Sequence, residues 1–225
     1  MADTVTLEPE GRERLLSKTE KIMARHMGTA WSAPMFGVTV EVAMENVLAR
    51  RADGVTVTDI LLADCAATLV EHPWINAHFR EDRVIEYGTV NIGLAVASDR
   101  GLTVPVIHNA EALSLTEIAE RRKTLVAKVR DGKIGIREVS GGTFTVSNLG
   151  MFGVTRFTAI INPPQVAILA IGATNRRQVW NGGAPEWRDI AELSLTSDHR
   201  AVDGAASARF LAALKARLEG HEAAA

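Results

Sequence analysis

A strongly apolar run at residues 90–97 constrains the fold of this chain more than any other segment, because it contains no charged side chain. Such a run is typical of a strand in the middle of a sheet, where both faces are covered. The sequence predicts further strands at residues 36–42, 143–147, 157–161, 166–171 and 190–196. The segment at residues 102–107 contains Pro105, which places it at a sheet edge or a bulge. A sheet of several strands is therefore expected.

Capping signals mark predicted helices between these strands. Ser17 with Glu20, and Ser114 with Glu117, have the capping-box pattern, in which both side chains accept hydrogen bonds from backbone N–H groups. One helix is predicted to begin at Ser17, and the others cover residues 58–71, 114–129 and 205–218. Helices interspersed with apolar strands predict an α/β (α+β) two-layer sandwich, in which helices pack on a mixed β-sheet.

Composition and charge favour one domain without a nucleic-acid or membrane partner. The 225 residues are 47% hydrophobic and carry a formal charge of −2, with basic and acidic side chains intermixed. No apolar run reaches the roughly 20 residues of a membrane span, and the N-terminus lacks the pattern of a secretory signal. The single cysteine, Cys65, is predicted to be a packing residue in a reducing compartment. We expect a cytoplasmic protein with a flexible arm or linker remnant at residues 1–16 and one domain at residues 17–225.

A short polar stretch at residues 197–204 carries the first candidate site residues. His199 is a candidate general base, since a neutral imidazole with a fixed orientation accepts a proton near neutral pH. Asp203 could orient it directly or hold its loop, and Gly204 would permit a turn closed to larger residues. On the residues alone, a second interpretation is at least as strong: Asp203 is the N-cap of the following helix, and His199 is a surface histidine.

Ser147, at the end of a predicted strand, is the second candidate. It has no glycine two places before or after it, so it is not the nucleophile elbow of an α/β-hydrolase. Followed by Asn148 and a glycine-rich turn, its hydroxyl suits a hydrogen-bond donor better than a nucleophile. The alternative is a turn residue that satisfies its own backbone.

Two long segments carry a family resemblance. Residues 197–210 (SDHRAVDGAASARF) resemble the active-site signature of the dihydrolipoamide acyltransferases, the core components of 2-oxo acid dehydrogenase complexes. Residues 141–153 (GGTFTVSNLGMFG), with residues 159–165 and 171–173, resemble a second segment of the same family. The resemblance extends over about residues 16–218. It implies the fold of chloramphenicol acetyltransferase and makes residues 17–225 an acyltransferase catalytic domain.

The resemblance also implies the chemistry. His199 would be the general base that removes a thiol proton, Ser147 the donor to the tetrahedral oxyanion, and Asp203 the organiser of the histidine loop. Asn148 and Gly204 are expected to contact substrate. An acyl group would pass directly between CoA, as donor or acceptor, and a dihydrolipoyl thiol on a partner domain or polypeptide. No metal is expected.

The family further implies a homotrimer with active sites between subunits, and other dehydrogenase-complex subunits as partners. The chain departs from the family pattern at Glu20, Met35 and Glu41. A lipoyl domain is not found in the sequence, so the chain is interpreted either as an excised core or as a stand-alone protein. Residues 218–225 lack a large apolar tail, which favours an isolated trimer. The alternatives are a chloramphenicol-acetyltransferase-type enzyme acting on another small acceptor, and a non-catalytic scaffold.

Overall fold

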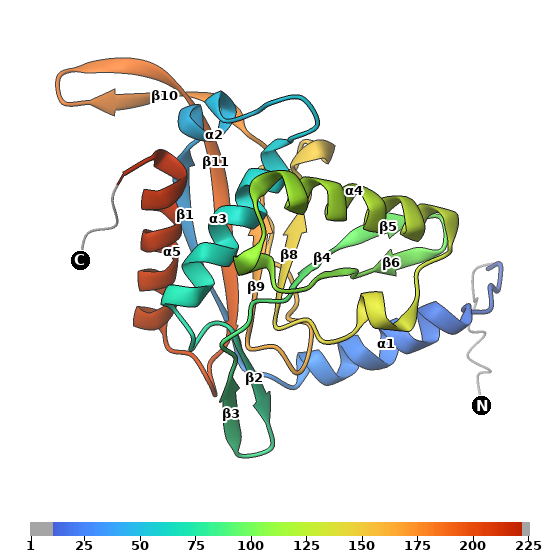
Figure 1. Ribbon diagram of the computed structural model, residues 1–225. Coiled ribbons are helices and arrows are strands. Elements are labelled where there is room, and N and C mark those ends of the chain that lie inside the picture. The colour runs from blue at the N-terminus through green and yellow to red at the C-terminus, as the bar shows by residue number, and fades with distance from the viewer. Residues whose placement is uncertain (1–10, 222–225) are drawn as a thin grey trace, which may run out of the picture.

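The structure is a computed structural model that describes residues 11–221. Its main feature is a seven-stranded mixed sheet (Figure 1). The strands follow the order β1 (Met35–Ala43), β11 (Ala184–Asp198), β9 (Ala167–Ile171), β8 (Phe144–Asn148), β4 (Ile92–Leu94) and β7 (Val106–Ile107), and β10 (Asn175–Asn181) pairs with β11 outside this order. β8 is parallel to β4 and to β9, and the other pairs are antiparallel. The predicted mixed sheet is confirmed.

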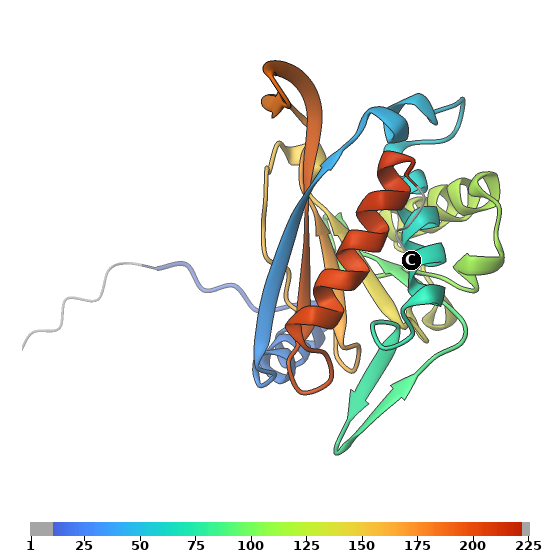
Figure 2. The ribbon, with the colours of Figure 1, turned by 90° about the vertical axis from the view of Figure 1, so that its left-hand side faces the viewer.

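Helices cover one face of this sheet and complete the predicted two-layer sandwich (Figure 2). They are α3 (Val57–Glu71), α4 (Leu115–Asp131) and α5 (Gly204–Glu219), with the short α2 (Glu45–Ala49) at one end. α1 (Lys18–Trp31) lies apart from them and packs against the opposite side through Ala30, which contacts Ile161 and Ile168. Small hairpins are formed by β2 (Ala77–Arg80) with β3 (Arg83–Glu86) and by β5 (Val96–Ser98) with β6 (Gly101–Thr103), and three-residue or four-residue 3₁₀ turns cover Ala110–Ala112, Ile136–Val139 and Gly150–Phe152.

The two faces of the sheet differ in chemistry. Leu193 and Leu195 of β11 are fully buried and belong to the main apolar core, together with Phe210 of α5. Because side chains alternate along a strand, their neighbours point to the opposite face. Cross-strand register places these side chains on that second face, which we call the polar face: Thr39, Thr145, Ser147, Glu192, Ser194 and Thr196.

Local capping signals placed the helices well. The capping boxes of Ser17 with Glu20 and of Ser114 with Glu117 are both present, at the start of α1 and α4. α3 begins earlier than predicted, because Thr56 rather than Thr58 or Asp59 is its N-cap. Cys65 is buried in α3, as predicted.

Two strand predictions need correction, and one strand was missed. Residues 157–161 form no strand; their alternating pattern is explained by Ala159 and Ile161, which pack against α1 and Ile168. The apolar run at residues 90–97 is divided into β4 and β5, with Ala95 between them. The polar segment Asn175–Asn181 forms β10, which was not predicted.

Some expectations concern the ends of the chain. Of the predicted arm at residues 1–16, residues 1–10 lie outside the described residues, and residues 11–16 are exposed and form neither helix nor strand. In the C-terminal segment, residues 222–225 also lie outside the described residues. Within residues 11–221, no helix combines the length and apolarity needed to cross a membrane.

Candidate active site

Ser147 lies on the polar face, near the end of β8, and lines a cavity of about 710 Å³. The cavity is bounded by the sheet, by α1 and by the segment at residues 157–165. Its apolar lining includes Met23 and Met27 of α1 and Val106 of β7, while Thr145 and Ser147 contribute hydroxyl groups. The hydrogen bonds of the described residues leave the Ser147 hydroxyl without a protein partner. A mainly apolar cavity with a few polar groups is typical of a small-molecule site.

Asn148 stabilises the turn after β8. Its side-chain oxygen accepts from the backbone N–H of Gly150 at 2.9 Å, and its Nδ2 donates to Thr58 Oγ1 of α3 at 3.2 Å. Both ends of the amide are therefore used within the protein. Contact between Asn148 and substrate stays a prediction.

His199 follows β11 in an exposed loop whose backbone is well held. Its N–H donates to the carbonyl of Pro34 at 3.0 Å, and its ring lies 4.6 Å from the ring of Phe36, centroid to centroid. The neighbouring Arg200 forms a bidentate ion pair with the buried Asp198, with a shortest distance of 2.6 Å. The hydrogen bonds of residues 11–221 include none to the His199 ring nitrogens, so the imidazole is open to a group from outside this chain.

Asp203 is the N-cap of α5, with its Oδ1 accepting from the N–H of Ala206 at 2.7 Å. In the described structure it forms no hydrogen bond with His199, so it acts on the histidine loop only through the backbone that joins them. Gly204 is the first residue of α5. A Cβ atom there would meet nothing within 4 Å, and the φ of Gly204 is not positive. Contrary to our expectation, the turn therefore does not require glycine.

The fold separates the serine from the histidine. Ser147 is paired with Ala170, and Ala170 with Ser194, so Ser194 lies two strands away, at about 10 Å. His199 comes five residues after Ser194, just past the end of β11, about 16 Å further along the chain direction. The two Cα atoms are thus about 19 Å apart, which is further than the two side chains together with one hydrogen bond of about 3 Å from each can span. One chain does not bring Ser147 and His199 to the same group.

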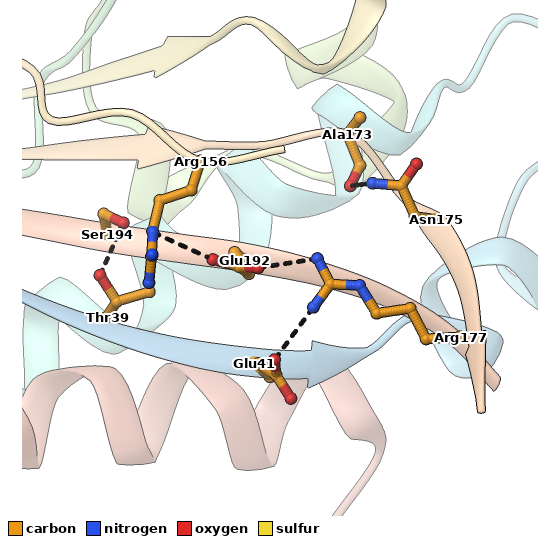
Figure 3. Close-up of polar contacts among 8 residues, drawn as sticks. All are labelled: Thr39, Glu41, Arg156, Ala173, Asn175, Arg177, Glu192 and Ser194. Carbon is orange, nitrogen blue, oxygen red and sulfur yellow. Dashed lines mark hydrogen bonds and ion pairs between the residues drawn. The ribbon is translucent and has the colours of Figure 1, made fainter. Parts of the chain in front are cut away.

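A charged cluster lies beside Ser194 on the polar face (Figure 3). Glu41 and Glu192 are directly opposite each other in β1 and β11, an arrangement that repels unless it is compensated. Arg177 of β10 compensates it, with contacts of 3.0 Å to Glu41 and 2.7 Å to Glu192. Arg156 lies 3.4 Å from the other oxygen of Glu192. The cluster ties β10 and the segment containing Arg156 to the sheet.

The cavity wall also contains a buried polar group that no pattern in the sequence indicated. His78 is 7% exposed. Since a carbonyl oxygen only accepts, the Nε2 of His78 donates to Gly142 O at 3.0 Å, and Nδ1 accepts from the Tyr87 hydroxyl at 2.9 Å. Burial lowers the pKa of His78, so the ring is neutral at pH 7. Gln165 is also buried and is bonded to Thr145. Only its place within a recognised segment could have indicated Gln165; nothing local indicated His78.

Metal binding is not supported in the described part of the chain, which contains no group of three or more His, Cys, Asp or Glu side chains that could hold an ion. Cys65 is not a candidate nucleophile, because burial raises the pKa of its thiol.

Known proteins resemble this chain along most of its length. The family model of the 2-oxoacid dehydrogenases acyltransferase (catalytic domain) matches residues 8–225. The mitochondrial dihydrolipoyllysine-residue acetyltransferase component of the pyruvate dehydrogenase complex of Schizosaccharomyces pombe is 42% identical over 217 residues, which are 91% of this chain and 45% of that protein. The chain spans about half the length of the curated relatives it matches.

Solved structures agree with this match. The dihydrolipoamide acetyltransferase of Azotobacter vinelandii has a TM-score of 0.89 at 33% identity, covering 93% of this chain and 92% of that one. In that protein a serine, a histidine and an asparagine have been investigated for their role in the catalytic mechanism. The spacing of these three residues along that sequence is the same as the spacing of Ser147, His199 and Asp203 in this chain. A chloramphenicol acetyltransferase shares the fold at 14% identity, with a TM-score of 0.58 over 87% of this chain and 92% of that one. This chain therefore belongs to the family of 2-oxoacid dehydrogenase acyltransferases and contains their catalytic domain.

Proposed function

We propose that the protein transfers an acyl group between CoA and a dihydrolipoyl thiol, with His199 and Ser147 as the reacting pair. The observation that carries this proposal is the placement of an unpaired Ser147 hydroxyl in an apolar cavity and of an unpaired His199 ring at the surface, at the sequence separation found in the Azotobacter enzyme. Within residues 11–221, neither the Ser147 hydroxyl nor the His199 ring forms a hydrogen bond.

His199 acts as the general base. A thiol has a pKa near 8.5 and is mostly protonated at pH 7, so an imidazole that accepts its proton generates the attacking thiolate where it is needed. The thiolate attacks the thioester carbonyl carbon and forms a tetrahedral intermediate. When this intermediate collapses, the other sulfur leaves and takes the proton back from His199. No acyl-enzyme forms. General base catalysis of this kind accelerates a reaction by a factor of about 10² to 10⁴.

The Ser147 hydroxyl donates a hydrogen bond to the oxygen that becomes negatively charged in the intermediate. One such donor contributes roughly 10² to 10³ in rate. Asp203 caps α5 and thereby fixes the backbone that follows His199. The Asp198–Arg200 pair fixes the backbone on either side of it.

The separation of about 19 Å within one chain implies that the site is completed by a second copy. We propose a homotrimer in which His199 of one chain faces Ser147 of the next. Lipoyl groups would be presented by a partner domain or polypeptide, and other subunits of a dehydrogenase complex would supply the acyl group.

The test is transfer of the acetyl group from acetyl-CoA to dihydrolipoamide by the purified protein, repeated with longer and branched acyl-CoAs to define the acyl group. His199→Ala should lower kcat more than Ser147→Ala, and circular dichroism should show both variants folded. Arg176→Ala, on exposed β10, is a control that should leave kcat unchanged. Equal rates for His199→Ala and the unmodified protein would refute the role of the histidine, and transfer only to other acceptors would refute the lipoyl substrate.

A further inference from the structure

Gln165 is held in the wall of the cavity by its side-chain oxygen. The residue is 4% exposed, and its Oε1 accepts from Thr145 Oγ1 at 2.6 Å. Thr145 precedes Ser147 by two residues, on the same face of β8. The hydrogen bond therefore fixes the orientation of the amide: the oxygen faces the strand, and the nitrogen faces away from it.

The amide nitrogen of Gln165 faces the cavity without a protein partner. Gln165 lines the cavity, and the hydrogen bonds of residues 11–221 include none from its Nε2. The adjacent Gly142 keeps this position open, since a Cβ atom there would lie 3.1 Å from Nε2 and 3.3 Å from Val106 Cγ2. The carbonyl of Gly142 is already used by His78. Nε2 is not among the fully buried polar atoms that lack a partner, so it is accessible from the cavity and its donor is available to a bound acceptor.

We propose that Gln165 is a substrate-binding residue, whose Nε2 donates a hydrogen bond to an amide carbonyl in the arm of the thiol substrate. This inference rests on the proposed function. CoA and dihydrolipoamide both carry an amide on a flexible chain behind the reacting sulfur. Thr145 lies about 7 Å from Ser147 along β8, so an amide bound at Gln165 would leave the thioester within reach of the Ser147 hydroxyl.

The position of this contact predicts a specific kinetic signature. A hydrogen bond made equally in the bound substrate and in the transition state affects KM and not kcat. Gln165→Met, which keeps the length of the side chain and removes the donor, should raise KM for one thiol substrate about 3- to 10-fold and leave kcat unchanged. KM measured separately for acetyl-CoA and for dihydrolipoamide identifies which arm is bound.

Two controls separate recognition of the amide from a change of shape. The same exchange at the exposed Gln178 of β10 should change neither constant. If the arm of dihydrolipoamide is the one bound, KM for 6,8-dimercaptooctan-1-ol, which lacks the amide, should be the same in the unmodified protein and in Gln165→Met. If the arm of CoA is bound, the matching substrate is a pantetheine analogue without the amide nearest the sulfur. Equal rises for substrates with and without the amide, unchanged KM values, or a fall in kcat alone would each overturn the proposal.

A binding measurement distinguishes this proposal from the proposed function. Calorimetric titration of CoA and dihydrolipoamide into the unmodified protein, Gln165→Met and Gln165→Glu requires no turnover. Gln165→Glu keeps the acceptor for Thr145 and loses the donor, so it should weaken binding as Gln165→Met does. Weakened binding in both variants with no transfer in the unmodified protein would support the role of Gln165 and refute the proposed function. Binding unaffected by either variant, or no binding to the unmodified protein, would overturn the role of Gln165.

Discussion

Two inactive variants should restore each other if the active site lies between chains. The variants are His199→Ala, which keeps the serine, and Ser147→Ala, which keeps the histidine. Within one chain the two Cα atoms are about 19 Å apart, a separation set by two strand spacings and five residues of β11 and its loop. If both side chains act on one reacting group, as proposed, the site needs the histidine of one chain and the serine of a neighbour.

The extent of restoration follows from the symmetry of the proposed trimer. Around a closed ring of three chains, every interface joins the histidine side of one chain to the serine side of the next. A trimer that contains both variants has a single interface with both side chains intact, whichever variant is present twice. About one third of the unmodified kcat per trimer is therefore expected. Each variant alone should be at least about 10²-fold slower than the unmodified protein, so the signal is clear.

The assay uses co-expression of the variants with two different affinity tags and purification through both tags in succession. Acetyl transfer to dihydrolipoamide is then measured per trimer, with doubly tagged trimers of each single variant as controls. Activity of the mixed trimers at the level of those controls would show that one chain supplies both residues, and would refute the geometry argued above.

Two further predictions concern stability. Asp203→Ala removes the N-cap of α5 and should lower the free energy of unfolding by about 1 kcal/mol and Tm by about 2–4 °C. Asp203→Asn should keep most of the stability, because asparagine is also a good N-cap. An unchanged Tm in the alanine variant would contradict the capping role. Burial would raise the pKa of Asp59, but hydrogen bonds from Arg122 and Thr56 lower it below its ordinary value. Its contribution to stability is then present above about pH 4 and lost as pH falls through the lower, folded pKa. Urea unfolding from pH 7 to pH 3 should show a smaller loss of stability in Asp59→Asn than in the unmodified protein, and equal losses would refute this.

The features that the sequence predicted well are local ones. The capping boxes at Ser17 and Ser114 placed α1 and α4, because a cap is a hydrogen bond between residues three apart. The end of α4 is equally local, since Gly132, its C-cap, has a φ of 70° that favours glycine. The two recognised segments identified the family and the candidate residues Ser147 and His199.

Strand pairing was predicted less well, because it depends on residues far away in the sequence. The alternation at residues 157–161 reflects packing on α1 and Ile168 rather than pairing in a sheet. β10 is polar and shows no apolar alternation, but it pairs along its whole length with the first half of β11. An alternation of apolar and polar residues indicates that one side of a segment is buried, but it does not identify the residues that cover that side.

The sequence by itself determined the fold class, the family and the identity of the candidate residues, since each of these rests on short-range patterns. Only the tertiary structure decided how those residues are arranged. It placed Asp203 on the end of α5 rather than on His199, buried Gln165 in the cavity wall, and put His199 and Ser147 about 19 Å apart. These distances depend on strand order and register, which arise from packing over the whole chain and leave no trace in a local spacing.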